Sequence, residues 1–223
     1  MPGKEQEPKD FQIGIVGPMG VGKSTLARLL ATNYGPEVVT ESFQKNPFLP
    51  KFYEDPKQYS FKSQVWFLLN KVGLLITPSP SKGGIIDPTL EMDKNYAEAQ
   101  HRLGMMTDAE WNLYCFLYDT LTSSSRIPEV NVFLSVKAPA GVLRERIRNR
   151  GRVYELWMLD NFPEYLDKLI KVVTDWERTA SKNHPIIDVD SQKYNFDANG
   201  PDRGDVLAMI TEGINSFLKE RQV

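Results

Sequence analysis

The sequence has few of the residues that build disulfides and transition-metal sites. Among its 223 residues there are one cysteine, Cys115, and two histidines, His101 and His184. A single cysteine excludes an internal disulfide framework, so we expect a reducing, cytoplasmic location. Neither histidine has cysteine, histidine or carboxylate neighbours at the spacing of metal ligands, so neither is a candidate zinc ligand.

Long apolar runs and strong net charge are also missing. No stretch approaches the roughly 18 consecutive apolar residues of a membrane-spanning helix. The polar segment 1–10 lacks the apolar centre of a signal peptide, and we expect it to be a disordered tail. The formal net charge is −2, which provides no overall field to attract nucleic acid. These absences argue against membrane and nucleic-acid partners, and they leave small anionic ligands open.

The order of apolar segments predicts the fold. With 41 % hydrophobic residues, the chain can bury one sizeable core, and we expect a single domain over 1–223. Five short β-branched or apolar runs are candidate strands, at 12–16, 37–40, 84–87, 130–136 and 185–189. Helical periodicity or helix end signals mark 23–33, 60–75, 107–121, 139–150, 164–183 and 205–221. The alternation predicts a three-layer α/β sandwich with a five-stranded parallel sheet flanked by helices.

The first candidate strand runs into a glycine-rich loop with the complete pattern G-x-x-x-x-G-K-[ST], from Gly17 to Ser24. Glycines allow successive backbone N–H groups to face phosphate oxygens, and the following helix adds the positive end of its dipole. Lys23 would neutralise the β- and γ-phosphates, and Ser24 would hold Mg²⁺. The expected contacts of the triphosphate are Gly17, Met19, Gly20, Val21, Gly22, Lys23, Ser24 and Thr25. The pattern predicts a P-loop NTPase fold that binds ATP and magnesium.

Two carboxylates follow candidate strands, where open parallel sheets collect their chemistry. Glu41 follows the second strand and Asp87 ends the third. Beside a bound triphosphate, such a group can coordinate Mg²⁺ or accept the proton of an attacking hydroxyl on the substrate. The alternatives are a turn-forming aspartate before Pro88 and a solvated loop charge at Glu41. We predict Asp87 as a magnesium and substrate ligand.

Five arginines alternate along 144–152, and Gly151 interrupts the helix that carries them. Arg146 and Arg150 are four residues apart and share a helix face, whereas Arg152 falls in the loop. Guanidinium groups beside a glycine-containing loop suit an arginine-rich lid that clamps transferring phosphates. A solvated helix face is the alternative, chiefly for Arg144 and Arg148.

Together with several shorter motifs, these features resemble the deoxynucleoside kinase family over nearly the whole chain. The further motifs are Thr40-Glu41, Asn46-Pro47-Phe48-Leu49, Phe52-Tyr53-Glu54-Asp55, Phe61-x-x-Gln64, Asp93 after Asp87, Arg150-Gly151-Arg152-x-x-Glu155 and Pro185-Ile-Ile-Asp-Val-Asp190. Each motif is weak alone, but their order and spacing are specific. The resemblance implies transfer of the γ-phosphate of ATP to the 5′-hydroxyl of a deoxyribonucleoside.

The resemblance also implies roles for individual residues. Glu41 corresponds to the general base toward the 5′-hydroxyl. Tyr53 and Glu155 correspond to the pair that holds the sugar 3′-hydroxyl, and Gln64 to the side chain that hydrogen-bonds the base. The lid arginines would be Arg146, Arg150 and Arg152.

The sequence departs from the family pattern near the expected base site. Asp93 corresponds to a carboxylate that reads the far edge of the base, but Lys71 stands where an arginine often partners it. Where the family usually has an acidic residue, arginine and serine, this chain has Asp87-Pro88-Thr89. Either Lys94 or Arg102 replaces the missing guanidinium, or the enzyme is slow, or its substrate is unusual.

Two other functions and one assembly stay open at this point. A nucleoside monophosphate kinase, similar to thymidylate kinase, would need cations for an acceptor phosphate, yet 29–101 contains no arginine, leaving lysines such as Lys45 and Lys51. A nucleotide-binding module with little turnover is the second alternative. The resemblance further implies a homodimer, for which Trp111 and Tyr114 are candidate surface residues, if they do not serve packing within the chain.

Overall fold

The computed structural model describes residues 11–35, 37–40, 42–77 and 84–220. Its centre is a sheet of five parallel strands in the order β2-β3-β1-β4-β5. The strands are β1 (Gln12–Val16), β2 (Glu37–Thr40), β3 (Gly84–Asp87), β4 (Val132–Lys137) and β5 (Ile186–Asp190). The parallel sheet predicted from the sequence is confirmed, with β4 and β5 displaced by one or two residues from the predicted runs.

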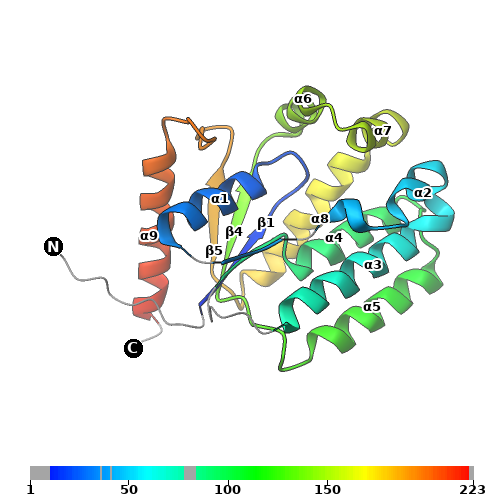
Figure 1. The fold of residues 1–223 in the computed structure, drawn as a ribbon, viewed down its shortest axis with the longest axis horizontal. Helices are drawn as coiled ribbons and strands as arrows, with labels where there is room; N and C mark the ends of the chain where they lie inside the picture. Colours follow the sequence, from blue (N-terminus) through cyan, green and yellow to red (C-terminus); the bar gives the residue numbers. More distant parts are fainter. Residues whose placement is uncertain (1–10, 36, 41, 78–83, 221–223) are drawn as a thin grey trace.

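Helices cover both faces of this sheet and make the expected three layers (Figure 1). On one side lie α1 (Lys23–Tyr34) and α9 (Arg203–Glu220). On the other lie α3 (Pro56–Ile76), α4 (Leu90–Arg102), α5 (Asp108–Thr122) and α8 (Tyr165–Ala180). Beyond the carboxyl ends of the strands lie α2 (Leu49–Glu54), α6 (Ala140–Arg150), α7 (Val153–Asn161) and a short 3₁₀ helix (Phe43–Lys45). No described helix combines the length and hydropathy needed to cross a membrane.

Two clusters of buried apolar side chains hold these layers together. Successive strand residues point to opposite faces of a sheet, so adjacent residues of β1 enter different clusters. Ile15 packs with Leu26 of α1, whereas Val16 packs with Phe133 of β4 and Leu169 of α8. Because both faces are buried, the strands appear in the sequence as continuous apolar runs rather than alternating ones.

Local signals account for most helix ends. A capping box begins α5, with Thr107 Oγ1 accepting from Glu110 N and Glu110 Oε2 accepting from Thr107 N. Gly151 ends α6 in the left-handed conformation, with φ of 67°. The third helix begins at Pro56, four residues earlier than predicted, because the Asp55 side chain caps it by accepting from Gln58 N.

Helices α2, α4 and α7 were not predicted from the sequence. The start of α4 carries a clear signal, since Thr89 Oγ1 accepts from Met92 N as a helix cap. Its buried face, however, mixes polar Asp93 and Asn95 with Met92, so its hydrophobic periodicity is weak. Helices α2 and α7 have only 6 and 9 residues. All three contribute side chains to the site described next.

Candidate active site

The loop after β1 adopts the conformation that its glycines predict. Gly17, Gly20 and Gly22 have φ of 141°, 81° and 106°, positive values that residues with a Cβ rarely adopt. A Cβ at Gly17 would lie 2.5 Å from the Val136 carbonyl oxygen. Lys23 Nζ donates to the Gly17 and Pro18 carbonyl oxygens at 2.7 and 2.9 Å. The loop thus curls around Lys23 at the amino end of α1, a ready anion site.

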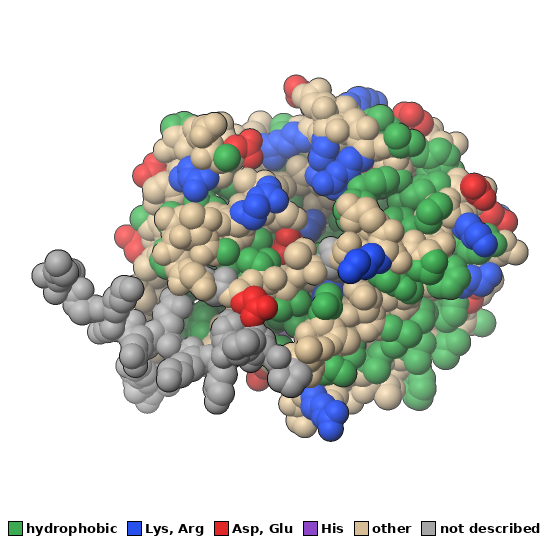
Figure 2. Space-filling view, in the orientation of Figure 1, with side chains coloured by type: hydrophobic (Ala, Val, Ile, Leu, Met, Phe, Trp, Pro, Cys, Tyr) green, Lys and Arg blue, Asp and Glu red, His purple; other side chains and the backbone are tan. Residues whose placement is uncertain are grey.

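A hollow adjoins this loop and faces the segment after β5; we call it the phosphate-loop cavity. Its lining includes Gly20, Val21, Gly22 and Thr25 of the phosphate motif and Arg146 and Arg150 of α6. Arg146 Nη1 donates to Ser191 Oγ at 2.9 Å, and Arg146 Nη2 donates to the Ser191 carbonyl oxygen. Figure 2 shows Lys and Arg side chains grouped over α6 at the rim of this region. Arg146 therefore fixes α6 to the far wall of the cavity.

Four of the eight predicted triphosphate contacts do not line this cavity: Gly17, Met19, Lys23 and Ser24. Ser24, the second residue of α1, is exposed. Met19 lines a second cavity on the other side of the loop. That cavity lies among α2, α3, α4 and α7, and we call it the interhelical pocket.

The interhelical pocket gathers the predicted acceptor residues from four helices. Tyr53 comes from α2, Gln64 from α3, Asp93 from α4 and Glu155 from α7. Aromatic and apolar side chains complete most of the wall, among them Phe52, Phe67, Tyr96, Met158 and Tyr165. A mostly apolar cavity with a few convergent polar groups is typical of a small-molecule site.

Asp93, which lines this pocket, belongs to a buried ion pair. Lys71 is 0 % exposed, and its Nζ lies 3.4 Å from Asp93 Oδ1. The same ammonium group donates to the Pro88 carbonyl oxygen at 2.7 Å. The cation beside Asp93 is therefore Lys71 of α3. It also binds the backbone of Pro88, the residue that stands where the family usually has an arginine.

Lys94 and Arg102, the other predicted replacements, point elsewhere. Lys94 Nζ lies 3.3 Å from Asp119 Oδ1 and covers the ring of Tyr118 on α5. Arg102 pairs with Glu98 and with Asp175. Neither lines the interhelical pocket. Replacement of the arginine by one of them was one of three alternatives, and these positions do not favour it, because both cations pair with acidic groups on the helical surface.

Glu155, which also lines the pocket, binds two of the predicted lid arginines. Arg150 binds the buried Glu155 carboxylate through both Nε (3.0 Å) and Nη2 (2.6 Å), and Arg152 Nη1 lies 3.5 Å from it. Since Arg150 also lines the phosphate-loop cavity, the pair connects the two cavities. Burial raises the pKa of the neighbouring Tyr53 phenol, which keeps it protonated as a hydrogen-bond donor. Arg144 instead pairs with Asp167 on the surface.

Of the two predicted strand-end carboxylates, Asp87 lies within the described residues. Asp87 ends β3 and is buried, and its Oδ1 has no hydrogen-bond partner among the described residues. Such a buried oxygen is costly unless a ligand or ion completes it. Glu41 lies outside the described residues.

Two aromatic residues of the interhelical pocket were not predicted from the sequence. Phe43 and Tyr154 line the interhelical pocket beside Tyr53. Their only signal in the sequence is proximity to the motifs, since Tyr154 directly precedes Glu155 and Phe43 follows Glu41 by two residues.

The strand order, the phosphate loop after β1 and the adjoining pocket define a P-loop phosphotransferase for a small acceptor. A sequence model described as deoxynucleoside kinase matches residues 13–215, and the chain belongs to this family. The protein is thus a kinase that transfers phosphate to a nucleoside hydroxyl.

Individual relatives agree with the family. The chain is 29 % identical over 211 residues to a deoxyguanosine kinase of Lactobacillus johnsonii, covering 93 % of this chain and 94 % of that protein. It is 30 % identical over 151 residues to a deoxyadenosine/deoxycytidine kinase of Bacillus subtilis, covering 67 % and 70 %. A deoxyadenosine kinase structure from M. mycoides with bound dCTP shares the fold, with a TM-score of 0.78, 23 % identity and coverage of 92 % and 100 %.

Proposed function

We propose that the protein transfers the γ-phosphate of ATP to the 5′-hydroxyl of a deoxyribonucleoside held in the interhelical pocket. The observation that carries this proposal is the Arg150–Glu155 pair, because one guanidinium lines the phosphate-loop cavity while binding a carboxylate of the pocket. Phosphoryl transfer needs donor and acceptor aligned more than it needs covalent chemistry from the protein. An arginine shared by the two cavities suits that alignment.

Each side of the reaction has its own residues in this proposal. Lys23 and the loop amides hold the β- and γ-phosphates. Arg146, Arg150 and Arg152 neutralise the charge that develops on the transferring group. Glu41 follows Thr40, the last residue of β2, in the sequence, and we assign it the role of accepting the proton from the 5′-hydroxyl.

Magnesium fits the donor side. The incomplete Oδ1 of Asp87 is a suitable oxygen ligand, and Ser24 supplies a hydroxyl at the start of α1. The described residues contain no group of three or more His, Cys, Asp or Glu side chains that could enclose a metal. Mg²⁺ normally takes one or two carboxylates together with substrate phosphates and water, so this sparse set is suitable. The ion would supply charge neutralisation on the phosphates.

The polar groups of the pocket indicate which bases fit. Asp93, paired with Lys71, presents acceptor oxygens, whereas the Gln64 amide both donates and accepts. A base with an exocyclic amino group satisfies this combination better than thymine. The names of the relatives, deoxyguanosine kinase and deoxyadenosine/deoxycytidine kinase, support an amino base and favour a purine.

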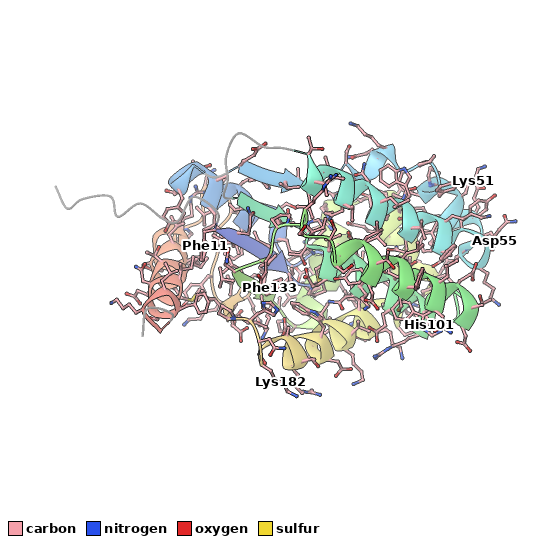
Figure 3. All side chains as sticks on the ribbon, turned by 90° about the horizontal axis from the view of Figure 1, so that it is seen from below. Phe11, Lys51, Asp55, His101, Phe133 and Lys182 are labelled. Atoms are coloured by element: carbon pink, nitrogen blue, oxygen red, sulfur yellow. The ribbon has the colours of Figure 1, made fainter. Side chains whose placement is uncertain are left out.

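A nucleoside monophosphate kinase is disfavoured by the charge of the pocket. Among the described residues that line it, Arg152 is the only cation, and Glu155 already binds that arginine. Lys51 covers the Tyr59 ring instead, and Figure 3 shows it at the helical end of the molecule, far from the sheet. A second phosphate on the acceptor would therefore meet little positive charge.

We also propose a homodimer through the outer face of α3 and α5. Leu69, Leu113 and Phe116 are exposed there, Phe116 by 66 %, and Figure 2 shows hydrophobic side chains gathered over these helices. Tyr114 is 0 % exposed and its ring stacks on Trp111, so of the two alternatives for this residue the structure favours packing within the chain. Phe116→Glu should give monomers in sedimentation velocity, while Val153→Glu on α7 should not. A wild-type monomer would contradict the dimer.

The function is tested by a steady-state phosphate-transfer assay with ATP, Mg²⁺ and a deoxynucleoside. The wild type should form the 5′-monophosphate. Glu41→Gln should lower turnover by about a hundredfold or more, because the variant cannot accept the proton. Equilibrium binding of ATP should stay unchanged. Absence of transfer by the wild type would contradict the function, and undiminished turnover by the variant would contradict only the role of Glu41.

A further inference from the structure

An apolar groove lies outside the interhelical pocket, where α2 and the 3₁₀ helix face α7. Phe43, Leu49, Tyr53 and Tyr154 line both the groove and the pocket. These four side chains are therefore the partition between the pocket and the outer surface. We call them the aromatic wall.

Tyr154 is the member that joins this wall to the lid. Its ring stacks on Tyr53 with centroids 5.8 Å apart and an angle of 26°. It also meets Phe43 edge to face at 5.3 Å. Ring pairs of this geometry contribute beyond the area they bury. One side chain of α7 thus holds residues from two other elements.

Tyr154 also lies close in the sequence to the predicted lid arginines. It is the second residue of α7, separated from the Arg150-Gly151-Arg152 turn by Val153 alone and directly before Glu155. The Arg152 guanidinium carbon lies 5.4 Å from the centre of the Phe43 ring, so two lid residues contact the same aromatic residue. Displacing the Tyr154 ring would loosen Tyr53 and the start of α7 together.

We propose that Tyr154 is a positioning residue of the acceptor site. Its ring holds Tyr53 against the pocket and closes the aromatic wall beside Tyr53. The inference rests on the proposed function, since it takes the interhelical pocket as the nucleoside site. Tyr154 acts through its ring and through Tyr53, and it takes no part in proton or phosphate transfer.

A positioning role affects the two substrates unequally. Tyr154 lines the interhelical pocket and not the phosphate-loop cavity. Removing its ring in Tyr154→Ala should raise the KM for the deoxynucleoside by about tenfold or more, because small displacements of positioning groups are costly. The KM for ATP should change less than about twofold. Tyr154→Phe retains the ring and should match the wild type.

The experiment compares both KM values and kcat for the wild type, Tyr154→Ala, Tyr154→Phe and Val153→Ala. Val153 is the matched control, because it lines the same groove but not the pocket and is 81 % exposed. If Tyr154→Ala does not fold, Tyr154→Leu replaces it, since leucine fills the space without the stacking geometry. Thermal unfolding of each variant identifies a folding defect.

An increase confined to the deoxynucleoside KM, restored in Tyr154→Phe, supports the proposal. An unchanged deoxynucleoside KM, an equal increase in both KM values, or an equal defect in Tyr154→Phe would overturn it. Absence of phosphate transfer by the wild type would instead contradict the proposed function itself.

Discussion

The phosphate-loop cavity and the interhelical pocket are built in different ways. The first joins a backbone loop to residues of α6 and of the segment after β5. In that loop the glycines have positive φ, and Lys23 binds two carbonyl oxygens of its own loop. The second is made of side chains from α2, α3, α4 and α7. Backbone amides recognise phosphate groups common to all nucleoside triphosphates, whereas side chains can change from one relative to the next. The comparison assigns general donor binding to one cavity and substrate choice to the other.

Lys23→Ala should have the largest effect and should damage the donor side alone. The variant loses the cation at the phosphates and the two hydrogen bonds that shape the loop. Turnover should fall by more than about a hundredfold. ATP binding, measured by calorimetry, should weaken strongly, while deoxynucleoside binding persists. Arg28→Ala, an exposed change on the same helix, is the control, and equal loss of both ligands would contradict the division between the cavities.

Glu155→Gln should have a smaller effect and should involve both cavities, because it breaks the pair that connects them. The amide cannot replace both charge-assisted hydrogen bonds from Arg150. The kcat/KM for the deoxynucleoside should decrease by about tenfold to a hundredfold. Asp167→Asn breaks the exposed pair with Arg144 at 2.6 Å and should change little. Similar kinetics for the two variants would remove the connecting role of Glu155.

Lys71→Arg should have the smallest effect and should alter substrate choice. A planar guanidinium cannot keep the 3.4 Å contact to Asp93 and the 2.7 Å bond to Pro88 without moving one of them. The kcat/KM values for the deoxynucleosides should change relative to one another by about fivefold to tenfold. Lys62→Arg, on an exposed position of α3, is the control. An unaltered order of substrates would show that Lys71 does not influence the base site.

The same contrast explains what the sequence could predict. The phosphate loop was predictable because Gly17 to Ser24 are consecutive and each position has a separate physical requirement. Asp93, Gln64, Tyr53 and Glu155 could be named through the family resemblance, and the fold does bring them into one pocket.

Contacts between distant segments could not be predicted. The hydrogen bond from Lys71 to the Pro88 carbonyl joins α3 to the turn between β3 and α4, 17 residues away in the sequence, and no local sequence pattern predicts it. The packing of Tyr154 on Phe43 and Tyr53 likewise depends on how α7 meets α2 after the turn at Gly151. Trp111 and Tyr114 carried no signal to separate a buried aromatic from an exposed one.

The central claim is that the interhelical pocket accepts an uncharged nucleoside. It is tested most directly by labelled-phosphate transfer from ATP to the four deoxynucleosides and, in parallel, to their 5′-monophosphates. The account predicts 5′-monophosphate products from the nucleosides with amino bases, purines foremost, and no transfer to monophosphates. Transfer to monophosphates alone would contradict it.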